Sequence, residues 1–172
     1  MSPTPTERFH LASAPDGLHV VQDLLNTRAI APYGLPDLIA DGETASTTWG
    51  TTLSDEDAAA LRTLRSDVEA AIAGDMAARP AVRVELVADA DGSVRLAPTG
   101  TGADYIASQI WAEILLAQQS GTWPRLKRCK NEACGSAFYD RSRNNSGVWH
   151  DVKTCGNVAN LRASRARKKA QT

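Results

Sequence analysis

The chain has 172 residues, of which 42% are hydrophobic and 23% are charged, values typical of a globular protein. No run approaches the 18 apolar residues of a membrane-spanning helix, and the first eight residues lack the apolar stretch of a secretory signal. These features predict a cytoplasmic protein without a membrane segment.

A net charge of −1 conceals a strong asymmetry along the chain. Residues 1–120 hold 7 basic and 17 acidic residues, a net of −10, whereas residues 121–172 hold 12 basic and 3 acidic residues, a net of +9. We therefore expect an acidic domain over 9–120 and a basic module over 121–172, after a disordered Pro/Thr-rich N-terminus at 1–8. The basic module favours a polyanionic partner, most often nucleic acid; attraction between the halves, or a solubilising tail, are the alternatives.

Apolar periodicity and turn residues predict the first elements of the acidic domain. A short strand is expected at 9–11, a helix at 16–28 and a short helix at 35–40. The polar stretch 43–52 is expected to form a loop.

The second half of the acidic domain gives stronger signals. Ser54, followed by three acids, predicts the start of a helix that ends near Gly74. Alternating apolar residues around Asp91-Gly92 predict a β-hairpin, and residues 104–119 predict another helix. The expected fold class is α+β: a mainly helical N-terminal domain with a β-hairpin, followed by a small basic module.

That module contains two ligand pairs of equal spacing, Cys129-x4-Cys134 and His150-x4-Cys155, separated by fifteen residues. They include all three cysteines of the chain. Paired soft ligands joined by a short loop are what a tetrahedral zinc site requires, and four protein ligands make the site structural rather than catalytic. We therefore predict Zn²⁺ as a structural cofactor; free thiols beside an incidental histidine are the alternative.

Few large apolar residues follow residue 121, so the module needs a metal to fold. We expect a small treble-clef-like unit in which Phe138 and Tyr139 pack beneath the metal. A basic helix from Val158 to Ala170 would end it, anchored by Val158 and Leu161. The candidate nucleic-acid contacts are the basic residues of the inter-ligand loop and this helix: Arg141, Arg143, Arg162, Arg165, Arg167, Lys168 and Lys169.

These motifs resemble the CGNR zinc-finger proteins, bacterial proteins described as stress-induced transcription regulators with an N-terminal regulatory domain. The resemblance is carried by Arg128-Cys129-x4-Cys134, Asp140-x-Ser142-Arg143-Asn144 and Trp149-x5-Cys155-Gly156-Asn157. Weaker upstream matches are Leu25-Asn26-Thr27, Leu35-Pro36-Asp37-Leu38, Leu61-Arg62 and Asp91-Gly92. The resemblance thus extends over nearly the whole chain and implies DNA binding, regulation of transcription and association with the nucleoid.

The chain departs from the family pattern at two positions. His150 stands where the family has a cysteine, a change that zinc accepts. Val158 stands where the family has the arginine that names the motif. If that arginine binds phosphate, this chain binds one phosphate fewer; if it is structural, Val158 compensates by packing.

The leading prediction is a DNA-binding transcription regulator whose acidic domain senses a small molecule, binds a protein or forms a homodimer. The residues proposed for a ligand pocket are Asn26, Arg28 and Arg62. A protein-interaction adaptor whose basic tail docks on an acidic partner is the alternative, and RNA binding is a third hypothesis. An enzyme is the weakest candidate, because the sequence offers no phosphate loop, no nucleophile set and no open metal site.

Overall fold

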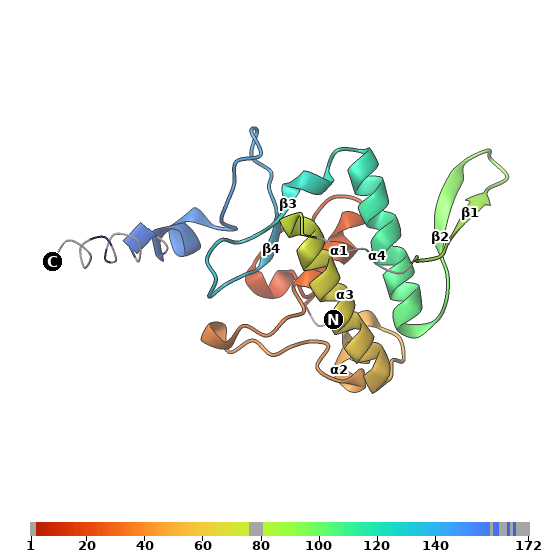
Figure 1. Ribbon diagram of the computed structural model, residues 1–172, viewed down its shortest axis with the longest axis horizontal. Helices are drawn as coiled ribbons and strands as arrows, with labels where there is room; N and C mark the ends of the chain where they lie inside the picture. The colour runs from red at the N-terminus through yellow and green to blue at the C-terminus, as the bar shows by residue number, and fades with distance from the viewer. Residues whose placement is uncertain (1–2, 76–80, 159, 162–164, 166, 168–172) are drawn as a thin grey trace.

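A computed structural model describes residues 3–75, 81–158, 160–161, 165 and 167 (Figure 1). A helical body lies in the centre, a β-hairpin projects on one side and the C-terminal module on the other. The helices are α1 (Leu18–Leu25), α2 (Gly42–Trp49), α3 (Asp55–Ala73) and α4 (Gly102–Gln119). Two antiparallel hairpins pair β1 (Val84–Ala88) with β2 (Val94–Pro98) and β3 (Leu126–Arg128) with β4 (Ala137–Tyr139). Short 3₁₀ turns lie at Glu7–Phe9, Ala31–Tyr33 and Trp123–Arg125. The α+β class is confirmed.

Helix α3 begins and ends where its sequence predicts. The Ser54 side chain accepts a hydrogen bond from the Asp57 amide, and the Asp57 carboxylate accepts one from the Ser54 amide in return. Gly74 ends the helix in the left-handed conformation that glycine adopts without strain. Asp57 also accepts a hydrogen bond of 2.8 Å from the amide of Ala103, so this acid joins the first turns of α3 and α4.

Helix α2 corrects two predictions. Residues 35–40 are not helical, contrary to expectation, and residues 43–49 of the expected loop belong to α2. Asp41 and Thr44 cap the helix reciprocally, with 2.8 Å between the Thr44 amide nitrogen and the Asp41 carboxylate. This cap stabilises the start of a helix that contains three threonines, residues of low helix propensity.

The N-terminus also differs from expectation. Disorder was predicted for residues 1–8, but residues 3–8 pack against α1; residues 1–2 lie outside the described part of the chain. Thr6 is fully buried and its amide donates to the Asp23 carboxylate, while Arg8 donates to backbone carbonyls of Asn26 and Pro36. These hydrogen bonds offset the entropy of ordering the segment. The expected strand at 9–11 is likewise replaced by the preceding 3₁₀ turn.

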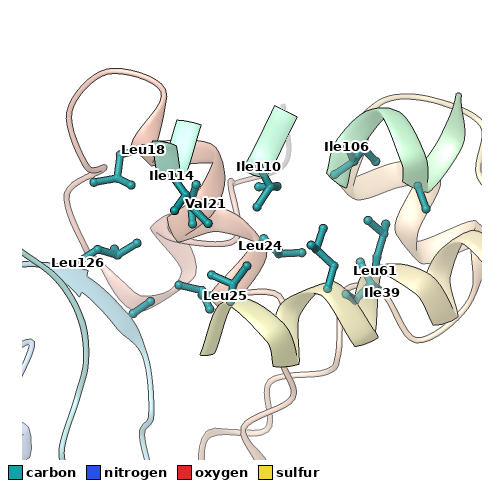
Figure 2. Packing of buried hydrophobic residues seen from close by; sticks show 14 of the residues in the cluster. Leu18, Val21, Leu24, Leu25, Ile39, Leu61, Ile106, Ile110, Ile114 and Leu126 are labelled. Atoms are coloured by element: carbon teal, nitrogen blue, oxygen red, sulfur yellow. The ribbon is translucent and has the colours of Figure 1, made fainter. Parts of the chain in front are cut away.

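One hydrophobic core unites the helices with the first part of the C-terminal module. Leu24 of α1, Leu61 of α3 and Ile110 of α4 are fully buried in it. Leu126 of β3 and Ala137 of β4 belong to the same cluster. In Figure 2 the labelled side chains of α1, α3 and α4 converge, and Leu126 enters from the C-terminal module. The hairpin β3–β4 of the C-terminal module therefore packs directly against the helical body.

The hairpin β1–β2 turns at Asp91-Gly92 as the sequence predicts, and Gly92 has a φ of 86°. It extends away from α4, with β1 as the outer strand (Figure 1). Within the described residues, no helix combines the length and apolar character needed to cross a bilayer.

Candidate metal centre

The structure brings the four predicted ligands together. The ligand atoms of Cys129, Cys134, His150 and Cys155 all lie within 4.8 Å of one another. The three cysteines are buried, at 5%, 3% and 1% exposed, and none forms a disulfide. A soft, water-excluded donor set of this kind matches the preference of Zn²⁺.

One distance tests the fit more closely. With Zn–S near 2.3 Å and Zn–N near 2.05 Å, a regular tetrahedron places sulfur and nitrogen about 3.6 Å apart. The Cys134 sulfur and His150 Nδ1 lie 3.4 Å apart. The cluster is thus a Cys3His centre arranged for structural zinc, with no ligand position left to substrate.

The first ligand pair is held by a tight turn between β3 and β4. The Cys129 amide donates to the Ser136 carbonyl at 2.9 Å, and the amides of Cys134 and Gly135 both donate to the Asn131 carbonyl. Gly135 has a φ of 60°, which a side chain would strain. The turn therefore aims both thiols inward.

The second ligand pair is shaped by Trp149 and Gly156. The partly buried ring of Trp149 packs against the three cysteines, while Tyr139 packs against the helical core instead of beneath the metal. A β-carbon on Gly156 would lie 3.3 Å from that ring, which explains the glycine. Asp151 caps the π-helical turn Val152–Gly156 that carries Cys155, since its carboxylate accepts from the Thr154 amide at 2.9 Å.

Contacts around the sulfurs shift the pKa values of two ligand thiols in opposite directions. A hydrogen bond from Cys129, together with those from His150 and Ser136, lowers the pKa of Cys134 despite its burial. The contact with Cys134, together with burial, raises the pKa of Cys129. The Asn131 side chain donates to the Cys155 sulfur at 3.3 Å. Such contacts orient thiolates and offset their charge when a metal is bound.

The loop between the ligand pairs is ordered by one buried carboxylate. Asp140 is 3% exposed, pairs with the Lys127 ammonium at 2.7 Å and accepts from the amides of Ser142 and Gly147. Burial alone would raise the pKa of Asp140, but these hydrogen bonds hold it well below its ordinary value. Arg143 lies exposed on this fixed loop.

The other predicted nucleic-acid contacts fall in three groups. Arg141 donates to the Ser13 carbonyl at 2.7 Å and lies over the Tyr139 ring, so part of its capacity is used within the protein. Arg165 and Arg167 are helical and exposed. The remaining three lie outside the described residues: Arg162, Lys168 and Lys169. Contact of the set with nucleic acid stays a prediction.

The described residues of the terminal helix, between 157 and 167, begin directly after the metal centre. Val158 is 40% exposed and Leu161 is 56% exposed, so the expected anchoring by these side chains is wrong. Figure 1 shows the helix projecting away from the body. Among the described residues, the helix is connected to the metal centre through the turn that carries Cys155, and Val158 and Leu161 do not anchor it.

The residues predicted for a ligand pocket have separate contacts. Asn26 is fully buried and pairs with β4: its amide group donates to the Ala137 carbonyl at 3.0 Å and its oxygen accepts from the Ala137 amide at 2.8 Å. Arg28 pairs with Glu69 at 3.2 Å, whereas Arg62 donates to the carbonyls of Ile39 and Ala40. A ligand pocket formed by the three stays a prediction.

Sequence analysis did not predict two contacts between the helical body and the metal module. Asn26 acts as a strand partner to β4, and Glu69 of α3 bridges Arg28 to Arg128 of β3. Neither produces a local signal, because the partners are far apart in the chain. For Glu69 the sequence offers one indication of an ion pair: it is a carboxylate near the end of an amphipathic helix, and arginines occur elsewhere in the chain.

Comparison with curated proteins found no match for this chain. Comparison with protein families found a match at the C-terminal end of the chain. The weaker resemblance of the upstream residues is therefore untested. Residues 125–168 match the family described as the CGNR zinc finger, so the family expected from the sequence is confirmed for the segment that holds the metal centre.

Proposed function

We propose that the chain is a DNA-binding transcription regulator that uses its zinc module as a rigid support for positive charge. The observation that carries this proposal is the loop ordered by Asp140. It fixes exposed Arg143 to the metal centre, from which the helix bearing Arg165 and Arg167 also departs. Groups held rigidly before contact lose less entropy on binding than a free basic tail does.

The charge distribution supports the same function. Residues 121–172 carry 12 basic and 3 acidic residues. Arginine and lysine on phosphates release counterions, which gives affinity that falls steeply with salt. Such contacts position a protein on the duplex, whereas base recognition would have to come from side chains reaching a groove. The exposed helix is the element suited to that task.

The acidic helical domain would receive the signal. The stress-induced regulators that the chain resembles carry such a domain before the finger. Asn26 and Glu69 connect this domain directly to β4 and β3, so a change in α1 or α3 would reach the metal module. In this role the protein would act in the cytoplasm, at the nucleoid.

A second function is favoured by a specific observation. Val158 and Leu161 are exposed apolar residues on the same helix as the arginines. Phosphates offer no partner to such side chains, whereas an acidic protein with an apolar groove does. The chain would then be an interaction adaptor. Val158→Ser removes the apolar surface without adding charge. If the chain is an adaptor, this variant should lose most of its binding to the protein partner. If the chain binds DNA, its DNA affinity should stay within about twofold of the parent chain.

Fluorescence anisotropy with genomic DNA fragments tests the main proposal. The logarithm of the binding constant should fall linearly with the logarithm of salt concentration. Replacing both Arg165 and Arg167 by alanine should reduce the slope by about 0.9 for each phosphate that the variant no longer neutralises. The matched control is Arg95→Ala, an exposed arginine on the opposite hairpin. Absence of binding at about 50 mM salt would reject DNA binding. An equal reduction with the control would reject Arg165 and Arg167 as phosphate contacts.

A further inference from the structure

The hairpin β1–β2 exposes large apolar side chains to solvent. Leu86 is 74% exposed and Val94 is 64% exposed. They share a face with Val84, Ala88, Leu96 and Pro98, because the register pairs Leu86 with Leu96, Ala88 with Val94 and Val84 with Pro98. Isolated two-stranded hairpins are marginal in water, and further strands stabilise them.

The outer edge of β1 has the hydrogen-bonding groups for another strand. The Asp89 amide donates to Ser93, and the Arg83 carbonyl accepts from the Thr99 hydroxyl, so these residues direct their peptide groups toward β2. Alternation along an antiparallel strand then directs the N–H and C=O groups of Val84, Leu86 and Ala88 outward. Among the residues that the structure describes, β1 pairs only with β2.

We propose that β1 is a dimerisation edge, and that its occupant is β1 of a second copy of this chain, paired antiparallel about Leu86. Leu86 then lies opposite its own counterpart, and Val84 lies opposite Ala88 of the second copy. The two hairpins form one four-stranded sheet. Apolar side chains of the two copies meet along its middle, which lowers the exposure of Leu86.

Complementary charges favour a second copy of the chain as the partner of β1, paired in the register centred on Leu86. Pairing about Leu86 places Arg83 opposite Asp89 of the second copy, and the two-fold axis repeats the pair. Glu85 lies opposite Val87, so no like charges face each other across the new seam. Arg83 is exposed, and Asp89 already accepts from Arg95 at 3.0 Å on the same face. Opposite charges facing across antiparallel strands stabilise the pairing, and like charges destabilise it.

Position in the molecule leaves room for the second copy. The hairpin projects beyond α4 with β1 outermost, on the side away from the metal module (Figure 1). Val84–Ala88 contains no lysine and no proline, two of the residues that keep exposed strands apart. Dimerisation here would leave both zinc modules free to act.

Sedimentation equilibrium of the zinc-loaded full chain tests the proposal. The parent chain should form dimers, and Leu86→Lys should be monomeric with an unchanged circular dichroism spectrum. Arg83→Asp should weaken the dimer roughly tenfold or more, because like charges then face each other twice. Adding Asp89→Arg to Arg83→Asp should restore at least part of that affinity. A parent chain that stays monomeric at about 100 μM, or a dimer unaffected by Leu86→Lys, overturns the proposal.

Cross-linking checks the register separately from the charges. Directly opposed residues of a hydrogen-bonded antiparallel pair have α-carbons about 5.5 Å apart. A short bismaleimide should therefore join two copies of the Leu86→Cys variant efficiently. Ala97→Cys, on the inner strand, is the matched control and should give little product, and the parent chain corrects for the zinc ligands. Equal cross-linking of the two variants would contradict pairing about Leu86.

Discussion

Replacing Asn26 by alanine tests whether the metal module depends on the helical body. The change removes both hydrogen bonds between the Asn26 side chain and the Ala137 backbone. The Ala137 carbonyl keeps a hydrogen bond from Gln22 at 3.2 Å, but the buried Ala137 amide loses the acceptor that it has in the structure. The cost should therefore come chiefly from one buried donor.

The magnitude follows from burial. An unpaired buried donor costs about 1–3 kcal/mol, and the space left by a fully buried side chain adds about 1 kcal/mol. We expect the free energy of unfolding to fall by about 2–4 kcal/mol, a large share of the 5–15 kcal/mol typical of a domain. Because β4 follows the first ligand pair, a loss of about 2 kcal/mol from the docked module should weaken zinc binding by up to about 30-fold.

Urea unfolding at fixed free zinc measures the first quantity, and competition with a chromophoric chelator measures the second. Asn144→Ala is the matched control, because Asn144 is an exposed asparagine in the same module. It should change the free energy of unfolding by less than about 0.5 kcal/mol. If Asn26→Ala behaves like this control in both assays, the coupling inferred from the Ala137 contacts is refuted.

Three further changes probe the metal centre, an ion pair of the helical body and the loop ordered by Asp140. Cys129→Ser should lower zinc affinity by more than about 100-fold, measured as metal content after dialysis against a weak chelator. Burial alone would raise the pKa of Asp37, but hydrogen bonds from Arg65 and a backbone amide lower it below its ordinary value. Its contribution to stability is therefore present at neutral pH and lost below about pH 4, so the stability gap between parent and Asp37→Asn should narrow on acidification in urea titrations. Gly147→Ala should weaken DNA binding with zinc content unchanged, because its β-carbon would lie 2.9 Å from the Asp140 carboxyl carbon.

Ser146→Ala serves as the control for the first and third of these changes, since Ser146 is exposed and next to Gly147. Full zinc retention by Cys129→Ser would contradict the assigned ligand set. A stability gap for Asp37→Asn that stays constant from pH 7 to pH 3 would contradict the lowered pKa. Equal DNA affinity of Gly147→Ala and Ser146→Ala would show that the loop does not position the contacts.

Local chemistry explains what could be predicted from the sequence. The metal centre was predictable because the type and spacing of four residues are enough to identify a set of metal ligands. The structure brings all four together. Helix α3 was predictable because Ser54 and Gly74 mark its ends with cap chemistry. The first hairpin was predictable because Asp91-Gly92 suits a tight turn between alternating strands. Each of these signals spans fewer than about thirty residues, within reach of sequence patterns.

The features that sequence analysis missed or got wrong have weak local signals or depend on contacts between distant residues. Helix α2 buries only Gly42 and Ala45 of its eight residues, so it shows almost no apolar stripe, and only the pattern Asp41-x-x-Thr44 announced its start. The order of residues 3–8 depends on Arg8 reaching carbonyls in a later turn. The pairing of Asn26 with β4 joins residues 111 positions apart. Contacts of this kind are decided by the whole fold, and the local sequence does not contain them.

The separation between Asn26 and Ala137 also has a consequence during synthesis. A ribosome that adds 5–20 residues per second needs roughly 6–20 s to deliver Ala137 after Asn26 has emerged. Throughout that interval the Asn26 side chain lacks the β4 backbone with which it pairs in the finished protein, and the core lacks Leu126 and Ala137. The core of the helical domain is therefore completed only after the first part of the C-terminal module has been synthesised.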